Sequence, residues 1–190
     1  YGRAAVLADD NNVYVYQCGS LVDPHERCTV ARTPAQSVAD TSTWRYWNGG
    51  DWTLPNSWTG DPAAAATMEL PPGTEVPIAA FTVTYDETVG AYVFGHSPYP
   101  LYSDRIAVRI ASTPVGPWTP AVEITFPNCI ETVDGEPKAC YAATIQPAFS
   151  RPGQLGLGYF DQYVADSAGG AEYYACSAQV AVDGPHAPNR

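Results

Sequence analysis

The feature that most restricts the fold of this chain is its dense scatter of helix-breaking residues. Eighteen prolines and sixteen glycines interrupt the 190 residues, and each proline lacks a backbone donor that a helix interior needs. Only residues 63–70 could form a short helical turn. The segments between the breakers are rich in β-branched and aromatic residues, and several alternate apolar with polar side chains. The sequence therefore predicts an all-β protein with strands at residues 13–16, 81–85, 91–94, 106–110, 122–126, 155–160 and 176–182.

Three hairpins of similar layout recur along the chain, at residues 4–17, 79–95 and 144–160. Each turns at Asp, Asn, Gly or Pro, which are the residues that tight turns favour. After each of the first two hairpins come a polar loop, a strand that ends in Thr-Pro, and a tryptophan, Trp44 or Trp118. Repeated units of this kind predict antiparallel β-propeller blades within a single all-β domain. The approximate blades are residues 1–75, 76–140 and 141–190.

Three units are too few to close a propeller, which needs about four to eight blades. We considered three explanations, in decreasing order of preference. An N-terminal segment precedes this sequence, a second chain supplies the other blades, or the fold is a β-sandwich instead.

The charge and the hydropathy of the chain exclude two classes of partner. Acidic residues outnumber basic ones by 20 to 9, and the net charge is −11. No basic stripe is available to neutralise phosphates, so we expect no nucleic-acid partner. The longest apolar runs fall far short of the roughly 20 residues needed to cross a bilayer. We therefore expect no membrane span.

Four of the five cysteines form two close pairs, Cys18 with Cys28 and Cys129 with Cys140. Each pair brackets a polar loop, and neither has the spacing of a zinc site. We interpret both pairs as local disulfides, which predicts an oxidising compartment and a secreted or cell-surface protein. The alternative is a set of reduced, partly buried thiols. Cys176 is left over, either bonded outside this sequence or buried and unpaired.

Three segments resemble the five-bladed β-propeller glycosidases: residues 43–52 (TWRYWNGGDW), 111–118 (ASTPVGPW) and 155–160 (LGLGYF). Within that group the chain is most similar to a formerly uncharacterised bacterial family that includes endo-D-arabinanases. The resemblance implies a five-bladed ring, carbohydrate as the ligand, and carboxylates on the innermost strands. The presumed inner strands at residues 4–7, 77–84 and 142–149 contain no Asp or Glu. This departure weakens the implied enzymatic activity.

In such a fold the long polar loops would meet on one face, where aromatic rings can stack on sugars and polar groups can bind hydroxyls. Glycoside hydrolysis needs one carboxylic acid and one carboxylate, and the best local candidates are Asp161 and Asp104. Trp44, Trp47 and Trp118 are interpreted as core. For the loop tryptophans, packing beneath the loop and ligand contact are equally reasonable. The predicted ligand-binding residues are Trp52, His96, Tyr99, Arg105 and Tyr163.

No nucleotide, zinc-hydrolase or nucleophile-elbow motif is present, and we expect neither a cofactor nor a metal site. Three functions remain open. The chain is part of a glycosidase-like propeller that acts on or binds a polysaccharide, a non-catalytic glycan-binding or adhesive module, or a structural subunit of a surface assembly.

Overall fold

The computed structural model describes residues 4–7, 11–19, 28–71, 81–97, 105–126, 132–133, 136–137, 139–164 and 171–181. Within these ranges the chain contains strands and short 3-10 turns but no α-helix. The strands form antiparallel sheets in which chain neighbours pair with each other. The prediction of an all-β protein is therefore confirmed.

The first sheet has the order β1-β2-β3-β4-β5. Its strands are β1 (Ala4–Leu7), β2 (Asn12–Cys18), β3 (Cys28–Pro34), β4 (Arg45–Trp47) and β5 (Trp58–Thr59). β2 and β3 pair along their whole length, from Asn12 opposite Pro34 to Cys18 opposite Cys28. β4 is short and pairs with β3 only at Ala31 and Arg32.

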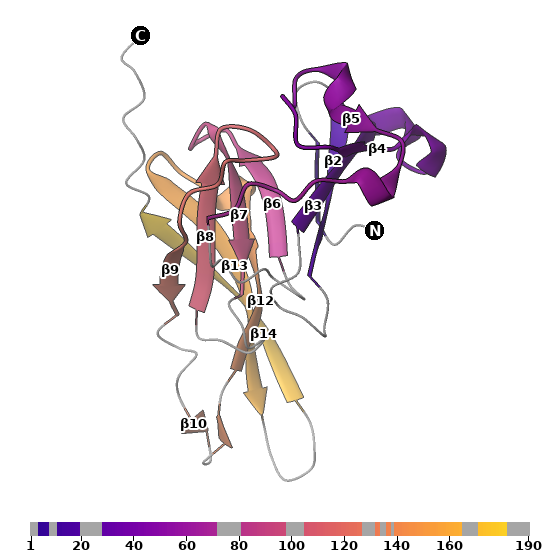
Figure 1. Ribbon diagram of the computed structural model, residues 1–190. Helices are drawn as coiled ribbons and strands as arrows, with labels where there is room; N and C mark the ends of the chain where they lie inside the picture. The colour runs from indigo at the N-terminus through magenta and orange to yellow at the C-terminus, as the bar shows by residue number, and fades with distance from the viewer. Residues whose placement is uncertain are drawn as a thin grey trace.

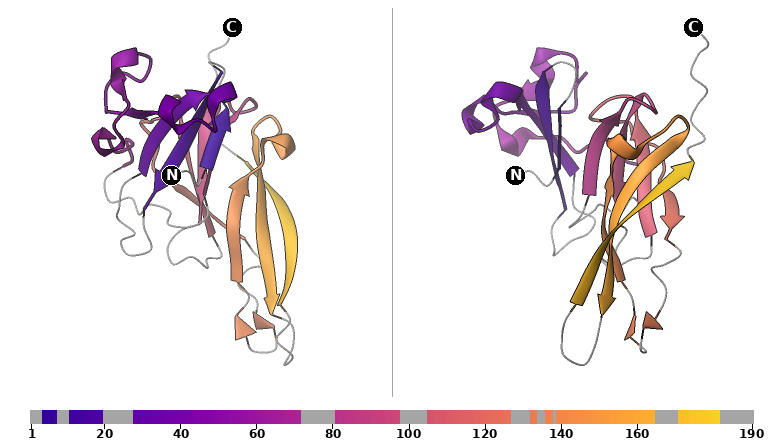
Figure 2. Two further views of the ribbon diagram at one scale, coloured as in Figure 1. Left: turned by 90° about the vertical axis from the view of Figure 1, so that its right-hand side faces the viewer. Right: turned by 180° about the vertical axis from the view of Figure 1, so that it is seen from behind.

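The second sheet has the order β6-β7-β8-β9 and lies between the other two large sheets (Figure 1, and the right-hand view of Figure 2). Its strands are β6 (Phe81–Asp86), β7 (Ala91–His96), β8 (Arg105–Ala111) and β9 (Val122–Thr125). Nearly every described residue of β7 and β8 is buried. A strand covered on both faces needs a continuous apolar run rather than an alternating one, which explains these two sequences.

The third sheet has the order β12-β13-β14, with β12 (Ala139–Ile145), β13 (Gln154–Val164) and β14 (Ala171–Ala181). Arg151 and Gln154 bridge a tight turn before β13, where the sequence predicted a hairpin. A separate two-stranded ribbon joins β10 (Thr132–Val133) to β11 (Glu136–Pro137). The first strands of the three large sheets are neighbours, since β6 contacts both β1 and β12.

Two apolar clusters hold the sheets together. The first interface, between the first and second sheets, contains Tyr14, Tyr16, Trp47, Phe94 and Trp118 among its buried residues. The second interface, between the second and third sheets, is built mainly from aliphatic side chains such as Val93, Leu155 and Leu157. Each face of the middle sheet thus serves a different core.

Gly95 lies where the second and third sheets approach each other closely. A Cβ atom at this position would lie 2.7 Å from Cδ1 of Ile145. The backbone amide of Ile145 also donates to Thr82 Oγ1 of β6 over 2.9 Å. Glycine lets the two sheets approach because it carries no side chain.

Candidate functional site at the end of strand β7

His96, a predicted ligand-binding residue, is the last residue of β7 and is 4% exposed. The pKa of its imidazole is lowered to about 4, mainly by burial and in smaller part by Arg109, against the opposing effects of the Ser97 carbonyl and Glu123. At neutral pH the ring is therefore uncharged. A buried neutral imidazole can accept one hydrogen bond and donate another.

The neighbouring carbonyl determines which nitrogen of His96 carries the proton. Nδ1 lies 3.3 Å from the carbonyl oxygen of Ser97, and a carbonyl oxygen can only accept a hydrogen bond. The proton of the neutral ring is therefore assigned to Nδ1, and Nε2 keeps its lone pair. Nε2 is buried and has no hydrogen-bond partner in the described part of the chain.

Arg109 and Trp118 lie around the same phenyl ring as His96. The rings of His96 and Trp118 are centred 5.4 and 5.5 Å from that of Phe94, and Arg109 is directly opposite Phe94 on β8. We call His96, Arg109 and Trp118 the His96 cluster. Because Phe94 belongs to the first interface, the cluster lies between the first and second sheets.

Each member of the His96 cluster has one buried nitrogen that lacks a partner among the described residues: His96 Nε2, Arg109 Nε and Trp118 Nε1. Arg109 Nη1 does donate to the Thr119 carbonyl over 3.1 Å. Burial also lowers the pKa of the Arg109 guanidinium. A buried polar group without a partner costs about 1–3 kcal/mol, so each of the three nitrogens calls for a hydrogen-bond partner that the described residues do not supply.

The arrangement offers two N–H donors and one lone pair. A hydroxyl group can donate to the His96 lone pair, and a hydroxyl group can also accept from the Arg109 or Trp118 N–H. An ordered water molecule and a sugar hydroxyl both meet this requirement. The cluster is therefore suited to a neutral hydroxyl-bearing molecule.

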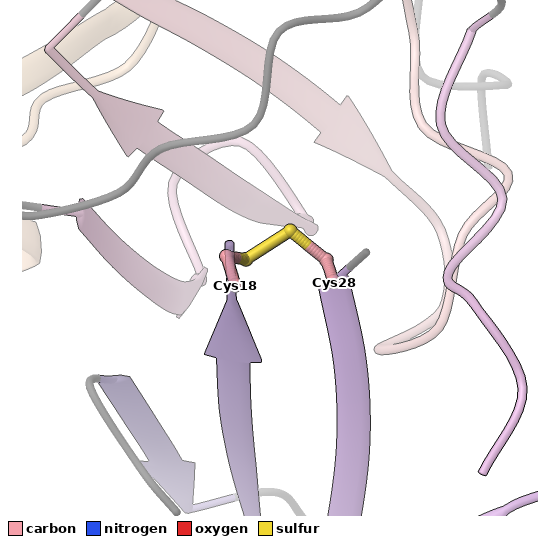
Figure 3. Close-up of a disulfide and its surroundings, with 2 residues drawn as sticks. All are labelled: Cys18 and Cys28. Carbon is pink, nitrogen blue, oxygen red and sulfur yellow. A yellow bond between two sulfur atoms is a disulfide. The ribbon is translucent and has the colours of Figure 1, made fainter. Parts of the chain in front are cut away.

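The Cys18–Cys28 disulfide, predicted from the sequence, is present and joins directly opposed residues of β2 and β3 (Figure 3). Its residues belong to the same buried cluster as Phe94 and Trp118. Met68 and Glu69 link the disulfide to Trp118. Met68 N donates to the Cys28 carbonyl over 2.8 Å, and the Glu69 carbonyl accepts from Trp118 N over 2.9 Å. The disulfide therefore cross-links β2 and β3 in the sheet that packs against the His96 cluster.

Residues 1–163 match the family described as "Domain of unknown function (DUF4185)". The chain belongs to this family. No curated protein matches it. The family description assigns no activity, so any function of this DUF4185 chain has to be argued from its own residues.

Arg105, another predicted site residue, opens β8 of the DUF4185 chain and pairs with Glu123 of β9 at 2.6 Å. Both side chains are nearly half exposed, 45% and 47%. An exposed pair of this kind contributes about 0–1 kcal/mol to stability. Asp104 and Tyr99, two further predicted site residues, lie outside the described residues.

Trp52 is half-buried and packs on the first sheet. Its ring centre lies 6.5 Å from that of Tyr14, and its carbonyl accepts from Trp58 Nε1 over 2.8 Å. Packing beneath the loop, one of the two roles considered for Trp52, is thus observed. A ligand contact through its exposed part stays a prediction.

Asp161 and Tyr163 are placed by their backbone in β13, where Asp161 is opposite Cys140 and Tyr174. Their side chains lie outside the described residues. Cys129 does too, so the predicted Cys129–Cys140 disulfide stays a prediction. Cys176 lies on β14 opposite Tyr159, again with no description of its side chain.

The sequence did not single out Arg109, and Trp118 was set aside as core. Trp118 is indeed buried in the first interface, but its indole nitrogen is one of the three that lack a partner among the described residues. An arginine within the apolar run RIAVRIA was the signal that could have revealed Arg109, because a buried guanidinium needs partners.

Two further searches of the described residues bear on this DUF4185 chain. No three His, Cys, Asp or Glu side chains gather there as a metal site would require. Within the same residues, no helix has the length and apolar character to cross a membrane.

Proposed function

We propose that this chain is a secreted or cell-surface, glycosidase-like β-propeller protein that binds or acts on a polysaccharide. The observation that carries the proposal is the His96 cluster, whose two N–H donors and one lone pair are buried and have no partner in the described part of the chain. Sugars present hydroxyl groups that donate and accept at once, and therefore suit such a set. The Cys18–Cys28 disulfide supports an oxidising compartment.

The propeller part of the proposal is supported by the order of the strands. β1, β6 and β12 are neighbours, and each large sheet continues strand by strand away from them. Successive blades of a propeller have this arrangement. In the proposed assembly further blades would come from residues outside this sequence or from a second chain. A β-sandwich is the alternative architecture.

Catalysis would need two carboxyl groups on either side of the bound glycosidic link, and Asp161 and Asp104 remain our candidates. A non-catalytic glycan-binding module is the second candidate function. This second function is favoured by the first strands of the three large sheets, β1, β6 and β12. Their one acidic residue is Asp86, whereas catalysis needs two carboxyl groups. That carboxylate is occupied, since it accepts from Thr88 N over 2.9 Å and from Ser150 Oγ over 2.5 Å.

A glycan array followed by calorimetric titration tests the proposal. Trp118→Phe removes one N–H donor and keeps an aromatic ring, and His96→Gln removes the imidazole lone pair. Each should weaken binding of the best polysaccharide about tenfold if the cluster bonds its hydroxyls. Trp52→Ala or Tyr163→Ala should cost about 1–3 kcal/mol of binding free energy where a sugar stacks on the ring.

Val93→Ala is the matched control, because Val93 is buried on β7 but belongs to the second interface. It should lower stability without lowering affinity. Equal losses of affinity for Val93→Ala and His96→Gln would contradict a role of the cluster in binding. Asp161→Asn separates the two functions: an enzyme loses release of reducing ends and keeps binding, whereas a binding module has no turnover to lose.

A further inference from the structure

A second polar hollow lies on the first sheet and differs in chemistry from the His96 cluster. Its volume is about 530 Å³, and its lining includes Arg32, Arg45, Asn12, Ser42 and Thr43. Among the described residues, no Asp or Glu contributes to the lining. Since the whole chain carries a net charge of −11, this hollow is a local reversal of the overall charge.

The two arginines occupy directly opposed positions, Arg32 on β3 and Arg45 on β4. Like charges that face each other across two strands destabilise a sheet. In the part of the chain that the structure describes, neither guanidinium forms an ion pair, and Arg105 with Glu123 is the pair found there. The repulsion between Arg32 and Arg45 is therefore not offset by a carboxylate of the described chain.

Other contacts hold both guanidiniums in place. Arg32 stacks on the Trp58 ring, with its Cζ 4.1 Å from the ring centre. Arg45 Nη1 donates to the carbonyls of Ser42 and Trp44 over 2.9 and 2.8 Å. These bonds use one nitrogen of Arg45, and a guanidinium has five N–H donors, so Nε and Nη2 remain for a ligand.

The hydroxyl groups of the hollow are already used as donors. Ser42 Oγ donates to the Asp40 carboxylate over 2.7 Å, and Thr43 Oγ1 donates to the Asp40 carbonyl over 2.7 Å. Among the lining residues, the two arginines therefore supply the charged N–H donors for a ligand. Paired arginines recognise carboxylates, phosphates and sulfates by parallel N–H···O bonds.

We propose that the Arg32–Arg45 hollow is a binding site for an oxyanion, presented either by free phosphate or by the carboxylate of an acidic sugar. The site is separate from the His96 cluster and does not depend on the proposed polysaccharide function. In this site the Arg45 side chain is exposed, and the Arg32 guanidinium is held against the Trp58 ring.

The test is a calorimetric titration of the full chain at constant ionic strength, with inorganic phosphate in one arm and glucuronate in the other. Constant ionic strength matters because salt screens exposed charges. At least one probe should bind with saturation, and Arg45→Gln should weaken it about tenfold or more. The probe that binds with the lower dissociation constant identifies the source of the oxyanion.

Arg151→Gln is the matched control, because Arg151 is an exposed arginine of the turn before β13 and does not line the hollow. It should leave the affinity for either probe unchanged. Arg32→Gln repeats the test on the second arginine. The proposal is overturned if neither probe saturates, or if Arg151→Gln weakens binding as much as Arg45→Gln does.

Thermal unfolding gives a readout that a purely structural role of Arg45 would not produce. Without an added oxyanion, Arg45→Gln relieves the repulsion with Arg32 but also loses the bonds from Nη1 to the Ser42 and Trp44 carbonyls, so its own unfolding temperature is the baseline for the ligand effect. The better probe should raise the unfolding temperature of the wild type, as a ligand of the folded state does. It should raise that of Arg45→Gln much less, and equal rises in both proteins would contradict the proposal.

Discussion

The two faces of the middle sheet are covered in different ways. On one face the first interface is aromatic and closed, with Tyr14, Tyr16 and Phe94 fully buried. On the other face the second interface is mainly aliphatic and borders a groove of about 540 Å³. Val122 lines that groove and is 65% exposed.

The difference arises from the segment that follows β5. Ala66 N donates to the Trp47 carbonyl over 2.7 Å, and Met68 N donates to the Cys28 carbonyl over 2.8 Å. This segment thereby extends the hydrogen bonding of the first sheet and covers the first interface. Among the described residues, no comparable segment covers the groove of the second interface.

The comparison shows how the chain combines stability with polar chemistry. The closed interface contains the disulfide and the His96 cluster, whose nitrogens are removed from water. The open interface contains apolar side chains and Tyr159. Polar groups interact more strongly where water is excluded, so each nitrogen of the His96 cluster matters more in the closed interface than it would beside the open groove.

The largest effect should come from truncating the aromatic core. Phe94→Ala should lower the free energy of unfolding by about 3–5 kcal/mol, because the ring is fully buried among three others. Leu155→Ala in the second interface should cost less, about 2–3 kcal/mol, because Leu155 lines the open groove and a site beside a groove can collapse more readily. Urea unfolding at constant slope measures both values. A larger loss for Leu155→Ala would break the comparison.

The first interface should also make stability depend on pH through His96. The pKa of His96 falls from 6.5 to about 4 on folding, so below pH 6.5 the unfolded state binds a proton that the folded state does not. Stability should be complete above pH 6.5 and fall by roughly 3 kcal/mol as the pH drops towards 4.

His96→Gln is the control for this pH dependence. A control is needed because carboxyl groups also titrate near the acidic end of this range. Hydrogen bonds from Ser42 and Thr53 lower the pKa values of Asp40 and Asp51, respectively. Subtracting the unfolding curve of His96→Gln from that of the wild type isolates the His96 contribution. Parallel curves between pH 4 and 6.5 would contradict the assignment.

Removal of the disulfide should have the next largest effect. The double variant Cys18→Ser, Cys28→Ser should lose about 2–3 kcal/mol, as expected for a cross-link that closes a short loop. Reduction of the wild type should give a similar loss in chemical denaturation. Peptide mapping without reduction checks this disulfide and the predicted Cys129–Cys140 disulfide together. Recovery of all four as alkylated thiols would contradict the predicted oxidising compartment.

A smaller effect should appear where the second and third sheets touch. Gly95→Ala should cost about 1–3 kcal/mol, because its methyl group meets Ile145. The same substitution in an Ile145→Ala background should cost much less, so the two changes should couple in a double-mutant cycle. Additive losses would show that the contact does not set the separation of the sheets.

The smallest effect should come from the groove of the second interface. Val122→Ser should change the free energy of unfolding by no more than about 0.5 kcal/mol, as expected for an exposed site. Measurement at two protein concentrations serves as the control for self-association. A loss above about 1 kcal/mol would show that the groove is covered in solution, which would reduce the contrast between the interfaces.

The sequence by itself determined the class of the fold and the main hairpins. Proline and glycine excluded long helices, and alternating apolar residues with turn residues located β2, β6 and β7 because these signals are local. The spacing of Cys18 and Cys28 around a polar loop likewise predicted their disulfide. These features depend on neighbours in the sequence, so no tertiary information was needed.

The tertiary structure decided which side chains of those strands meet. His96, Arg109 and Trp118 surround Phe94 because β7 and β8 pair in one register and because residues 66–69 bring the first sheet against Trp118. Arg32 and Arg45 face each other because a short β4 pairs with β3 at those residues. The sequence does not show these contacts, because register and sheet packing join residues far apart in the chain, and a shift of one residue would turn every side chain to the other face.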